Sequence, residues 1–340
     1  MLRQCVVIAA PRRVEVVEEA LPPGRPGQLL VQTEVSGISP GTEMLFYRGQ
    51  VPADMAVDAN LNALAQSEVQ YPLRYGYSCV GRVIEVAAGA HGAVPGEDQR
   101  EWLQRRVFVF APHASHFWVD PENVLVVPSG LDPTIAALLP NMETAVNFVM
   151  DGQPIIGERV VVVGQGVVGL LTLALLRQFP LQQLTAVDLF EQRRAAALRL
   201  GADSAIFLER DQPPAGWDGA DLAFELSGSP AALNTAIALT GFAGRVVIGS
   251  WYGQKQAPIN LGGAFHRSRI RLIASQVSTI DPQWSGRWDK GRRFALAWRM
   301  LQQLKPALLI THRLPITEAA AAYQLIDEQN QQPIQVVLTY

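Results

Sequence analysis

The chain has 340 residues and a net charge of −3, so its composition gives no reason to expect nucleic acid or an anionic membrane as a partner. It contains two cysteines, Cys5 and Cys79, which excludes a four-thiolate zinc site or a disulfide framework within one chain. No stretch approaches the ~20 apolar residues that cross a bilayer, and the N-terminus lacks the features of a signal peptide. We expect a soluble, cytoplasmic protein of roughly two domains.

The first 130 residues predict short strands separated by turns. Their strand candidates are rich in valine and partly alternate in polarity: CVVIAA, RVEVVEE, QLLVQTEVS, CVGRVIEVA, RRVFVFA and NVLVVPS. Proline–glycine pairs such as Pro40-Gly41 separate them. This region therefore predicts a mostly β domain, interrupted by a short helix within residues 53–70.

The pattern changes near residue 133. Residues 133–152 have the apolar spacing of a helix, and an apolar strand, RVVVVG, follows. Helices and strands then alternate as far as IRLIASQ, which predicts a parallel sheet wound on both faces. After residue 277 we expect two further helices and a final strand, PIQVVLTY.

The strongest local signal is RVVVVGQGVVGLL, in which Gly164, Gly166 and Gly169 form G-x-G-x-x-G between a strand and a helix. The first glycine permits the tight turn, the second lets the backbone approach a pyrophosphate, and the third lets helix and strand pack closely. Val167 and Val168 lie between the second and third glycines and belong to the predicted cofactor site.

Asp188 ends the next strand, LTAVD, where a carboxylate would bind both hydroxyls of the adenosine ribose and repel a 2′-phosphate. NAD is therefore favoured over NADP as the cofactor. Arg193 and Arg194 leave the alternative open, because a nearby arginine can bind a 2′-phosphate, although both are also consistent with solvated surface charge.

Two later strand ends should also face the cofactor, because ligands bind beyond the carboxyl edge of such sheets. These are Ser227-Gly228, after LAFEL, and Gly249-Ser250, after RVVI. Ordinary glycine turns are the alternative interpretation.

A β-rich region, this fingerprint and the C-terminal segment ITHRLPITEAAAAY together resemble the medium-chain dehydrogenase/reductase superfamily over nearly the whole chain. The resemblance implies an α/β protein: a GroES-like β-rich catalytic domain at 1–141, completed by 277–340, and a Rossmann doubly wound parallel-sheet nucleotide-binding domain at 142–276. It also implies an active site between the domains and frequent homodimers. SGISPGTEMLFYRGQVP and YPLRYGYSCVGRVIEV resemble the bacteriochlorophyllide dehydrogenase-like branch, whose best-known member oxidises a hydroxyethyl group on a chlorin.

Zinc-dependent members of this superfamily place cysteine, histidine and a third cysteine or acid at positions where this chain has Ser39, Tyr77 and, near the third position, Pro140. Zinc binds thiolate, imidazole or carboxylate, and none of these remains at the three positions. The sequence therefore predicts an enzyme without metal.

Without zinc, hydroxyls and acids of the protein must manage charge on the substrate oxygen. The GISPGTE loop supplies Ser39, Thr42 and Glu43, and Tyr77 supplies a phenol. The alternatives are that Tyr77 only fills the vacated metal volume and that Glu43 forms a salt bridge or a surface charge.

Other candidates lie outside that loop. His113 and His116, in PHASHF, could line the substrate mouth or relay protons, or be held by neighbouring backbone. Thr144 matches the family position that touches the nicotinamide, whereas its neighbour Glu143 could simply complement the helix dipole. Aromatic residues such as Trp251-Tyr252 would suit a bulky or aromatic small-molecule substrate if they line the pocket.

The leading hypothesis is a zinc-independent, NAD-linked dehydrogenase that interconverts a secondary alcohol and its ketone. One alternative is an NADPH-linked enone or quinone reductase, against which Asp188 argues. The other is a non-catalytic protein that senses a dinucleotide or serves a structural role.

Overall fold

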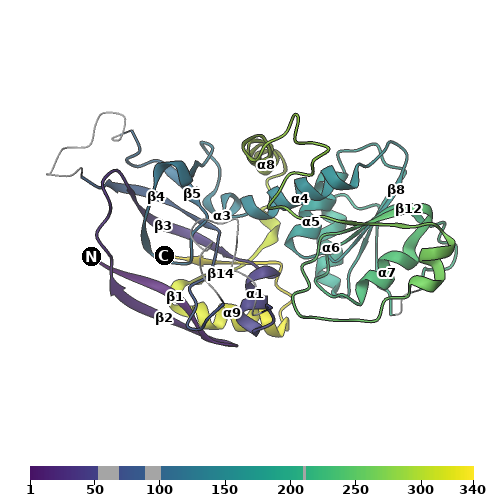
Figure 1. The fold of residues 1–340 in the computed structure, drawn as a ribbon, viewed down its shortest axis with the longest axis horizontal. Coiled ribbons are helices and arrows are strands. Elements are labelled where there is room, and N and C mark those ends of the chain that lie inside the picture. The colour runs from purple at the N-terminus through teal and green to yellow at the C-terminus, as the bar shows by residue number, and fades with distance from the viewer. Residues whose placement is uncertain (53–68, 89–100, 210–211) are drawn as a thin grey trace. The chain divides into compact units, whose positions relative to one another are not determined.

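The computed structural model describes residues 1–52, 69–88, 101–209 and 212–340 (Figure 1). The chain forms two compact units, Met1–Pro140 with Ile310–Tyr340, and Asn141–Leu309. The helix predicted within residues 53–70 lies almost wholly outside the described residues.

The first unit is built mainly of strands. A two-stranded antiparallel sheet pairs β1 with β2, and a seven-stranded sheet has the order β14-β15-β3-β4-β5-β7, with β6 pairing β3. The strands are β1 (Leu2–Ala10), β2 (Arg13–Ala20), β3 (Leu29–Ile38), β4 (Cys79–Val86), β5 (Arg106–Val109), β6 (His116–Val119), β7 (Val124–Val126), β14 (Ile310–Pro315) and β15 (Gln335–Thr339). The C-terminal strand β15 lies beside β3, so the end of the chain completes this unit.

In the described part of this unit, the strands are accompanied by the α-helices α1 (Thr42–Arg48), α3 (Pro133–Ala136) and α9 (Ala319–Glu328). The apolar face of α9 packs with α1 and β2 around a core that includes Phe46, Tyr75 and Tyr323. A second apolar core lies under β3, β4 and β5. Short 3-10 turns are Pro121–Asn123 and Ile316–Glu318.

The second unit is a six-stranded parallel sheet of order β10-β9-β8-β11-β12-β13. Its strands are β8 (Arg159–Val163), β9 (Gln183–Val187), β10 (Ser204–Ile206), β11 (Ala220–Glu225), β12 (Thr240–Ile248) and β13 (Arg271–Ala274). Its helices are α4 (Leu139–Gly152), α5 (Val167–Leu176), α6 (Glu191–Arg199), α7 (Ala232–Leu239) and α8 (Lys290–Leu304), with short turns at Leu261–Phe265 and Ala307–Leu309.

The strand order reverses between β8 and β11. From β8 the chain moves outward through β9 to β10, and from β11 it moves the other way through β12 to β13. Right-handed crossovers therefore put α5 and α6 on the opposite face of the sheet from α7. Such a reversal is where doubly wound folds bind dinucleotides.

Two boundaries differ from the predicted ones. The single helix expected over 133–152 is divided into α3 and α4, because Pro140 in the first turn of α4 cannot continue a helix that includes Ala136. The return to the first unit falls at Ile310 and not at residue 277, so α8 belongs to the nucleotide-binding unit.

The reason for the second difference is Arg293 of α8, which is completely buried. Its guanidinium donates to Glu143 Oε1 at 2.8 and 3.0 Å and to Asn147 Oδ1 at 2.6 Å, both on α4. It also donates to the carbonyls of Val277 and Thr279. Glu143 therefore does more than complement a helix dipole, because it holds α8 against α4.

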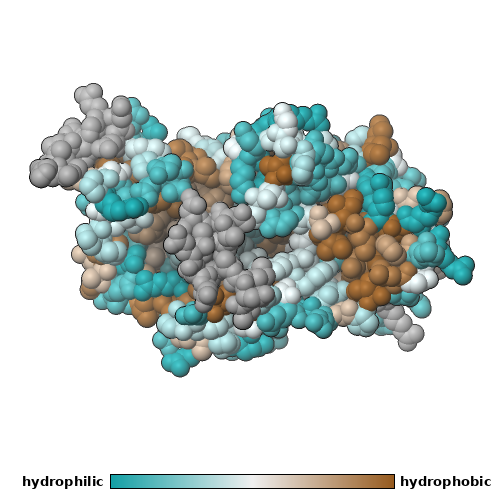
Figure 2. All heavy atoms as spheres, in the orientation of Figure 1, coloured by the Kyte–Doolittle hydropathy of each residue, from teal (hydrophilic) through white to brown (hydrophobic). Residues whose placement is uncertain are grey.

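Among the described residues, exposed large hydrophobic side chains are more numerous in the second unit. Figure 2 shows a broad hydrophobic area on the visible face of this unit, whereas the surface around α8 is mostly hydrophilic. The exposed residues in this unit include Ile155, Ile156, Leu189, Leu198, Phe207, Phe242, Trp251 and Leu261. In the described part of the chain, no helix combines the length and the apolarity that crossing a membrane requires.

Replacing Arg293 by leucine should lower the free energy of unfolding by about 3–5 kcal/mol, because Glu143 would remain buried without its partner. The measurement is the urea-unfolding midpoint of the whole chain. Arg299→Leu, on the exposed face of the same helix, is the control and should change stability by about 0.5 kcal/mol or less. Equal losses in both variants would contradict this role of Arg293.

Candidate active site and cofactor site

The glycine-rich turn has the shape that a dinucleotide requires. Gly164 has a φ of +94°, and a Cβ on Gly169 would lie 1.9 Å from the carbonyl oxygen of Gly164. A Cβ on Gly166, by contrast, would meet nothing within 4 Å. Gly166 caps α5 without a side-chain bond, so the amides of Val167 and Val168 are not occupied by a capping side chain. Open space at this helix N-terminus fits a pyrophosphate.

Asp188 is fixed directly beside this turn. Its Oδ2 accepts the backbone N–H of Gln165 at 2.6 Å, and its Oδ1 accepts that of Phe190 at 2.8 Å. Only 9% of the residue is exposed, so few rotamers are open to it. Each carboxylate oxygen retains acceptor capacity for a ribose hydroxyl, and the site fits NAD.

The two arginines after Asp188 are half-buried, unlike the solvated charges that one interpretation expected. Arg194 donates to the carbonyls of Asp188 and Leu189 at 2.9 and 2.8 Å. The guanidinium of Arg193 lies 4.8 Å from the ring centre of Phe190, and burial lowers the pKa of Arg193. Arg194 is thus bound to the protein's own backbone.

The ends of β11 and β12 form one polar network. The N–H of Gly228 donates to Ser250 Oγ at 2.9 Å, and Gly249 has no room for a side chain because a Cβ would lie 2.3 Å from Phe148. Ser227 donates to Glu225 through its N–H and its hydroxyl, at 2.9 and 2.5 Å. The structure therefore brings all four predicted residues of these loops together.

The sequence analysis missed Glu225, which is completely buried. It also missed that the hydroxyl of Tyr252 donates to Glu225 Oε2, at 2.5 Å. A signal was present, because one acidic residue interrupts the otherwise apolar run LAFEL. A carboxylate in such a position needs donors nearby, and the serine and tyrosine of the adjacent loops supply them.

In the first unit, Glu43 and His113 form a buried pair. Nε2 of His113 lies 2.8 Å from Glu43 Oε1, and its Nδ1 lies 2.6 Å from Ser36 Oγ. Glu43 also accepts the hydroxyl of Tyr323 and, at 2.9 Å, the N–H of Ser39. Because Glu43 is completely buried and His113 is 1% exposed, neither side chain is open to a substrate in the way that the sequence interpretation envisaged.

The hydrogen bonds of this network have a consistent direction. Burial raises the pKa values of Tyr323 and Tyr340, with the Glu43 carboxylate as a further cause, so both phenols remain donors. Tyr340 lies 2.7 Å from Ser36 Oγ. Tyr340 can then donate to Ser36, Ser36 to His113 Nδ1, and His113 Nε2–H to Glu43. The hydroxyl–imidazole–carboxylate order is that of a hydrolase triad, but Ser36 is completely buried and cannot act as a nucleophile.

Ser39 and Tyr77 are half-buried at the edge of this network. The hydroxyl of Tyr77 donates to Ser39 Oγ at 2.7 Å. Thr42 begins α1 and is also half-buried. His116 lies on β6 with its Nδ1 3.1 Å from Ser115 Oγ, and burial lowers its pKa. The two histidines of PHASHF thus have different partners, and the structure does not join them in one relay.

The side chains present do not fit a zinc ion of the family type. Among the residues that the structure describes, no three or more histidine, cysteine, aspartate or glutamate side chains lie close enough to hold a metal. Cys79 is completely buried, its Sγ lies 3.2 Å from the carbonyl of Ala111, and desolvation raises its pKa far above that of a free thiol. A thiol held protonated in this way is a poor zinc ligand.

Thr144 lies in the first turns of α4, half-buried, directly after Glu143. Burial raises the pKa of Glu143, and the nearby Arg293 lowers it in part. The fixed ion pair holds this turn of α4, and therefore Thr144, in one position within the second unit.

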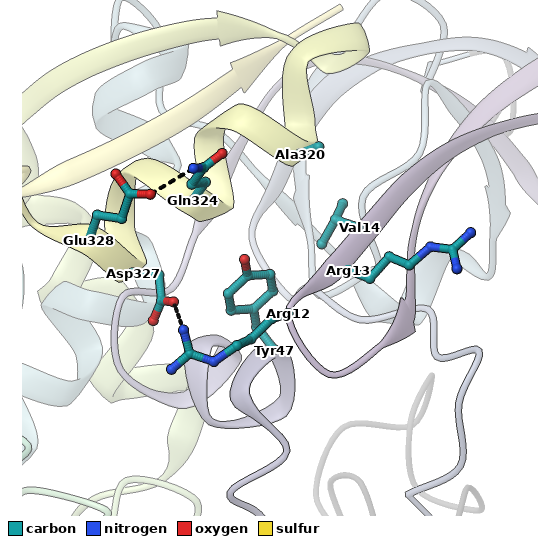
Figure 3. Close-up of a pocket in the computed structure, with 8 residues that line it drawn as sticks. All are labelled: Arg12, Arg13, Val14, Tyr47, Ala320, Gln324, Asp327 and Glu328. Atoms are coloured by element: carbon teal, nitrogen blue, oxygen red, sulfur yellow. Dashed lines mark hydrogen bonds and ion pairs between the residues drawn. The ribbon is translucent and has the colours of Figure 1, made fainter.

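A pocket of about 440 Å³ opens in the first unit between the β1–β2 turn and α9. Figure 3 shows Arg12 bound to Asp327, Gln324 bound to Glu328, and Tyr47 between the two elements. None of the predicted site residues lines it. Two of its charged side chains, Arg12 and Asp327, pair with each other.

Comparisons with known proteins relate the chain to dehydrogenases. The sequence model of the family described as Zinc-binding dehydrogenase matches residues 167–292. L-threonine 3-dehydrogenase of Bacillus subtilis is 27% identical over 225 residues, which cover 63% of this chain and 60% of that protein. The match therefore spans less than two thirds of that relative.

Solved structures extend the likeness to the whole chain. The alcohol dehydrogenase rspB of Escherichia coli CFT073, complexed with NADH, has a TM-score of 0.75 at 20% identity and covers 100% of this chain and 99% of that one. A zinc-binding dehydrogenase of Sinorhizobium meliloti bound to NADP also has a TM-score of 0.75, at 18% identity, with 100% of both chains covered. These matches confirm the predicted fold class.

Asp188→Ser should weaken NAD binding about tenfold to a hundredfold, because charged hydrogen bonds to the ribose are lost, and should weaken NADP binding much less. Dissociation constants for both cofactors, measured by calorimetry, test this. Glu191→Gln, an exposed acid in the first turn of α6, is the control and should leave the preference unchanged. An unchanged ratio of the two constants in Asp188→Ser would contradict the ribose assignment.

Proposed function

We propose that this chain is an NAD-dependent dehydrogenase that moves a hydride between the nicotinamide and a secondary alcohol or its ketone, and that it does so without zinc. The observation that carries the proposal is the 2.7 Å hydrogen bond from Tyr77 to Ser39. By resemblance, these are the positions where zinc-dependent relatives hold a cysteine and a histidine. Here the two side chains bind each other.

The direction of this bond leaves Ser39 able to act as a donor. Tyr77 gives its hydrogen to Ser39 Oγ, so the hydroxyl hydrogen of Ser39 is available for another acceptor. A substrate carbonyl oxygen beside Ser39 would receive that hydrogen bond. A donor fixed before the reaction stabilises negative charge that develops on the oxygen, which is the task of zinc in the relatives.

Proton movement follows from the same pair. In ketone reduction, Ser39 would pass its proton to the substrate oxygen and receive the proton of Tyr77, and the half-buried Tyr77 would regain a proton from solvent. In the oxidation of the alcohol these transfers would run in reverse. The pair therefore moves one proton at the reacting oxygen, as a general acid or base must.

Glu43 and His113 position this pair and do not contact the substrate. Glu43 accepts the N–H of Ser39 at 2.9 Å and is held by His113 and Tyr323. Glu43, His113 and Tyr323 are all buried. The hydrogen bond from Glu43 to the N–H of Ser39 therefore fixes the backbone of Ser39, and with it the position from which Ser39 contacts Tyr77. For Thr42 and His116 we propose only that they line the substrate site, without a role in proton transfer.

The cofactor side of the proposal is supported by the open glycine turn and by Asp188. Gly166 and the amides of Val167 and Val168 would hold the pyrophosphate, and Asp188 the ribose. Similar folds bind NADH in one case and NADP in another, so the choice of NAD rests on Asp188. Bound NAD supplies the hydride acceptor.

Several finer assignments belong to the same proposal. The sequences of the segments SGISPGTEMLFYRGQVP and YPLRYGYSCVGRVIEV favour the bacteriochlorophyllide dehydrogenase-like branch. They do not favour a chlorin as the substrate. A small-molecule substrate, a homodimer and a cytoplasmic location remain predictions.

Ser39→Ala should lower kcat about a hundredfold, because a preorganised donor is lost, and Tyr77→Phe about tenfold, because it acts through Ser39. The assay is NADH formation with a panel of secondary alcohols, or NADH consumption with their ketones. Tyr71→Phe, which removes a phenol that binds the carbonyl of Phe46, is the control and should retain kcat. NAD affinity should be unchanged in all three variants. No turnover of any panel member by the natural chain would favour a dinucleotide sensor.

Dialysis against a chelator should leave turnover unchanged, because no step depends on a metal. Metal analysis of the purified chain should find zinc well below one ion per chain, and added zinc should not increase the rate. Stoichiometric zinc that survives dialysis and is required for turnover would refute the zinc-independent mechanism.

A further inference from the structure

A second acidic residue, Glu225, lies at the carboxyl end of β11 in the nucleotide-binding unit. Its carboxylate is completely buried and accepts three hydrogen bonds: from the N–H and hydroxyl of Ser227, at 2.9 and 2.5 Å, and from the hydroxyl of Tyr252 at 2.5 Å. All three donors are neutral groups. Among the described residues, no cation forms an ion pair with Glu225. A buried negative charge is therefore hydrogen-bonded but not neutralised.

The position of Glu225 in the sheet determines which half of a dinucleotide it meets. The glycine turn follows β8 and Asp188 follows β9, so the adenosine half lies over β8 and β9. A dinucleotide crosses the sheet where the strand order reverses, between β8 and β11. The nicotinamide half then lies over the ends of β11 and β12, and the loops that begin there are the ones bound to Glu225.

We propose that Glu225 is the counter-charge for the oxidised nicotinamide ring, so that it stabilises bound NAD⁺ relative to bound NADH. The inference rests on the proposed function, because it requires NAD at this edge of the sheet. The nicotinamide ring is positively charged in NAD⁺ and neutral in NADH, whereas the rest of the cofactor is the same. A fixed negative charge in a poorly hydrated site distinguishes the two forms by Coulomb attraction over several ångströms, without a direct contact.

The side chains around Glu225 join the loops that surround it. Burial raises the pKa of Tyr252, and the Glu225 carboxylate beside it is a further cause, so Tyr252 remains a donor. The ammonium of Lys255, in the same loop, donates to the carbonyl of Gly228. Hydrogen bonds therefore connect the loops that follow β11 and β12.

The test compares the dissociation constants of NAD⁺ and NADH for the whole chain, by calorimetry and by fluorescence of bound NADH. Glu225→Gln keeps the size of the side chain and removes its charge. We expect NAD⁺ to bind about tenfold more weakly, which corresponds to about 1.4 kcal/mol, with little change for NADH. Tyr252→Phe removes one hydrogen bond and keeps the charge, so the ratio of the two constants should stay close to that of the natural chain.

Two outcomes overturn the proposal. Equal weakening of NAD⁺ and NADH in Glu225→Gln would show that the residue only holds the loops, and no change in either constant would show that it is remote from the ring. If Glu225→Gln does not fold, the double variant Glu225→Leu with Tyr252→Phe, which replaces both partners by apolar groups, must show the same selective loss of NAD⁺. Failure of the natural chain to bind either form would instead refute the proposed function.

Discussion

A carboxylate that leaves water must be given hydrogen-bond donors or a cation, and this requirement organises both units of the chain. Among the residues that the structure describes, three glutamates are almost completely buried: Glu43 in the first unit, and Glu143 and Glu225 in the second. Each one is satisfied by groups from segments that are distant in sequence or from adjoining loops. The donors cannot move without exposing a buried charge, so the segments that carry them are fixed.

The three carboxylates differ in the partners they have, and this difference separates their roles. Glu143 has a guanidinium and holds two helices together. Glu43 has an imidazole, a phenol and a backbone N–H, and it fixes the loop that carries Ser39. Glu225 has only neutral donors. A carboxylate that already has a cation cannot balance another positive charge, which excludes Glu143. Of the other two, only Glu225 lies in the nucleotide-binding unit, so it is the one suited to act on a charged ring of the cofactor.

The parts of the fold that depend on local pattern could be predicted from the sequence. The alternation of valine-rich strands and apolar helices gave the parallel sheet, and the glycine spacing after RVVVV gave the turn at Gly164. Asp188 followed from its place at the end of the next strand. The division between α3 and α4 was also open to prediction, because Pro140 stands where a continuous helix would require a backbone N–H.

The parts that depend on long-range partners could not be predicted in this way. Nothing local to Arg293 indicates that Glu143, distant in sequence, buries its guanidinium, and the domain boundary near residue 277 was misplaced for that reason. The same holds for His113, whose spacing from His116 suggested a pair although its partners are Ser36 and Glu43. Sequence spacing identifies neighbours on one element, whereas burial of charge is decided between elements.

Gly76 connects the buried pair to the hydroxyls that replace the metal ligands. It has a φ of +125°, and a Cβ at this position would lie 2.7 Å from the ring of His113. The imidazole therefore packs against the backbone immediately before Tyr77, while its Nε2 binds the carboxylate that holds Ser39. One buried histidine thus locates both members of the Tyr77–Ser39 pair, one through packing and the other through Glu43. In zinc-dependent relatives a cation would draw the corresponding ligands together, and in this chain a network of hydrogen bonds can bring the two hydroxyls within hydrogen-bonding distance.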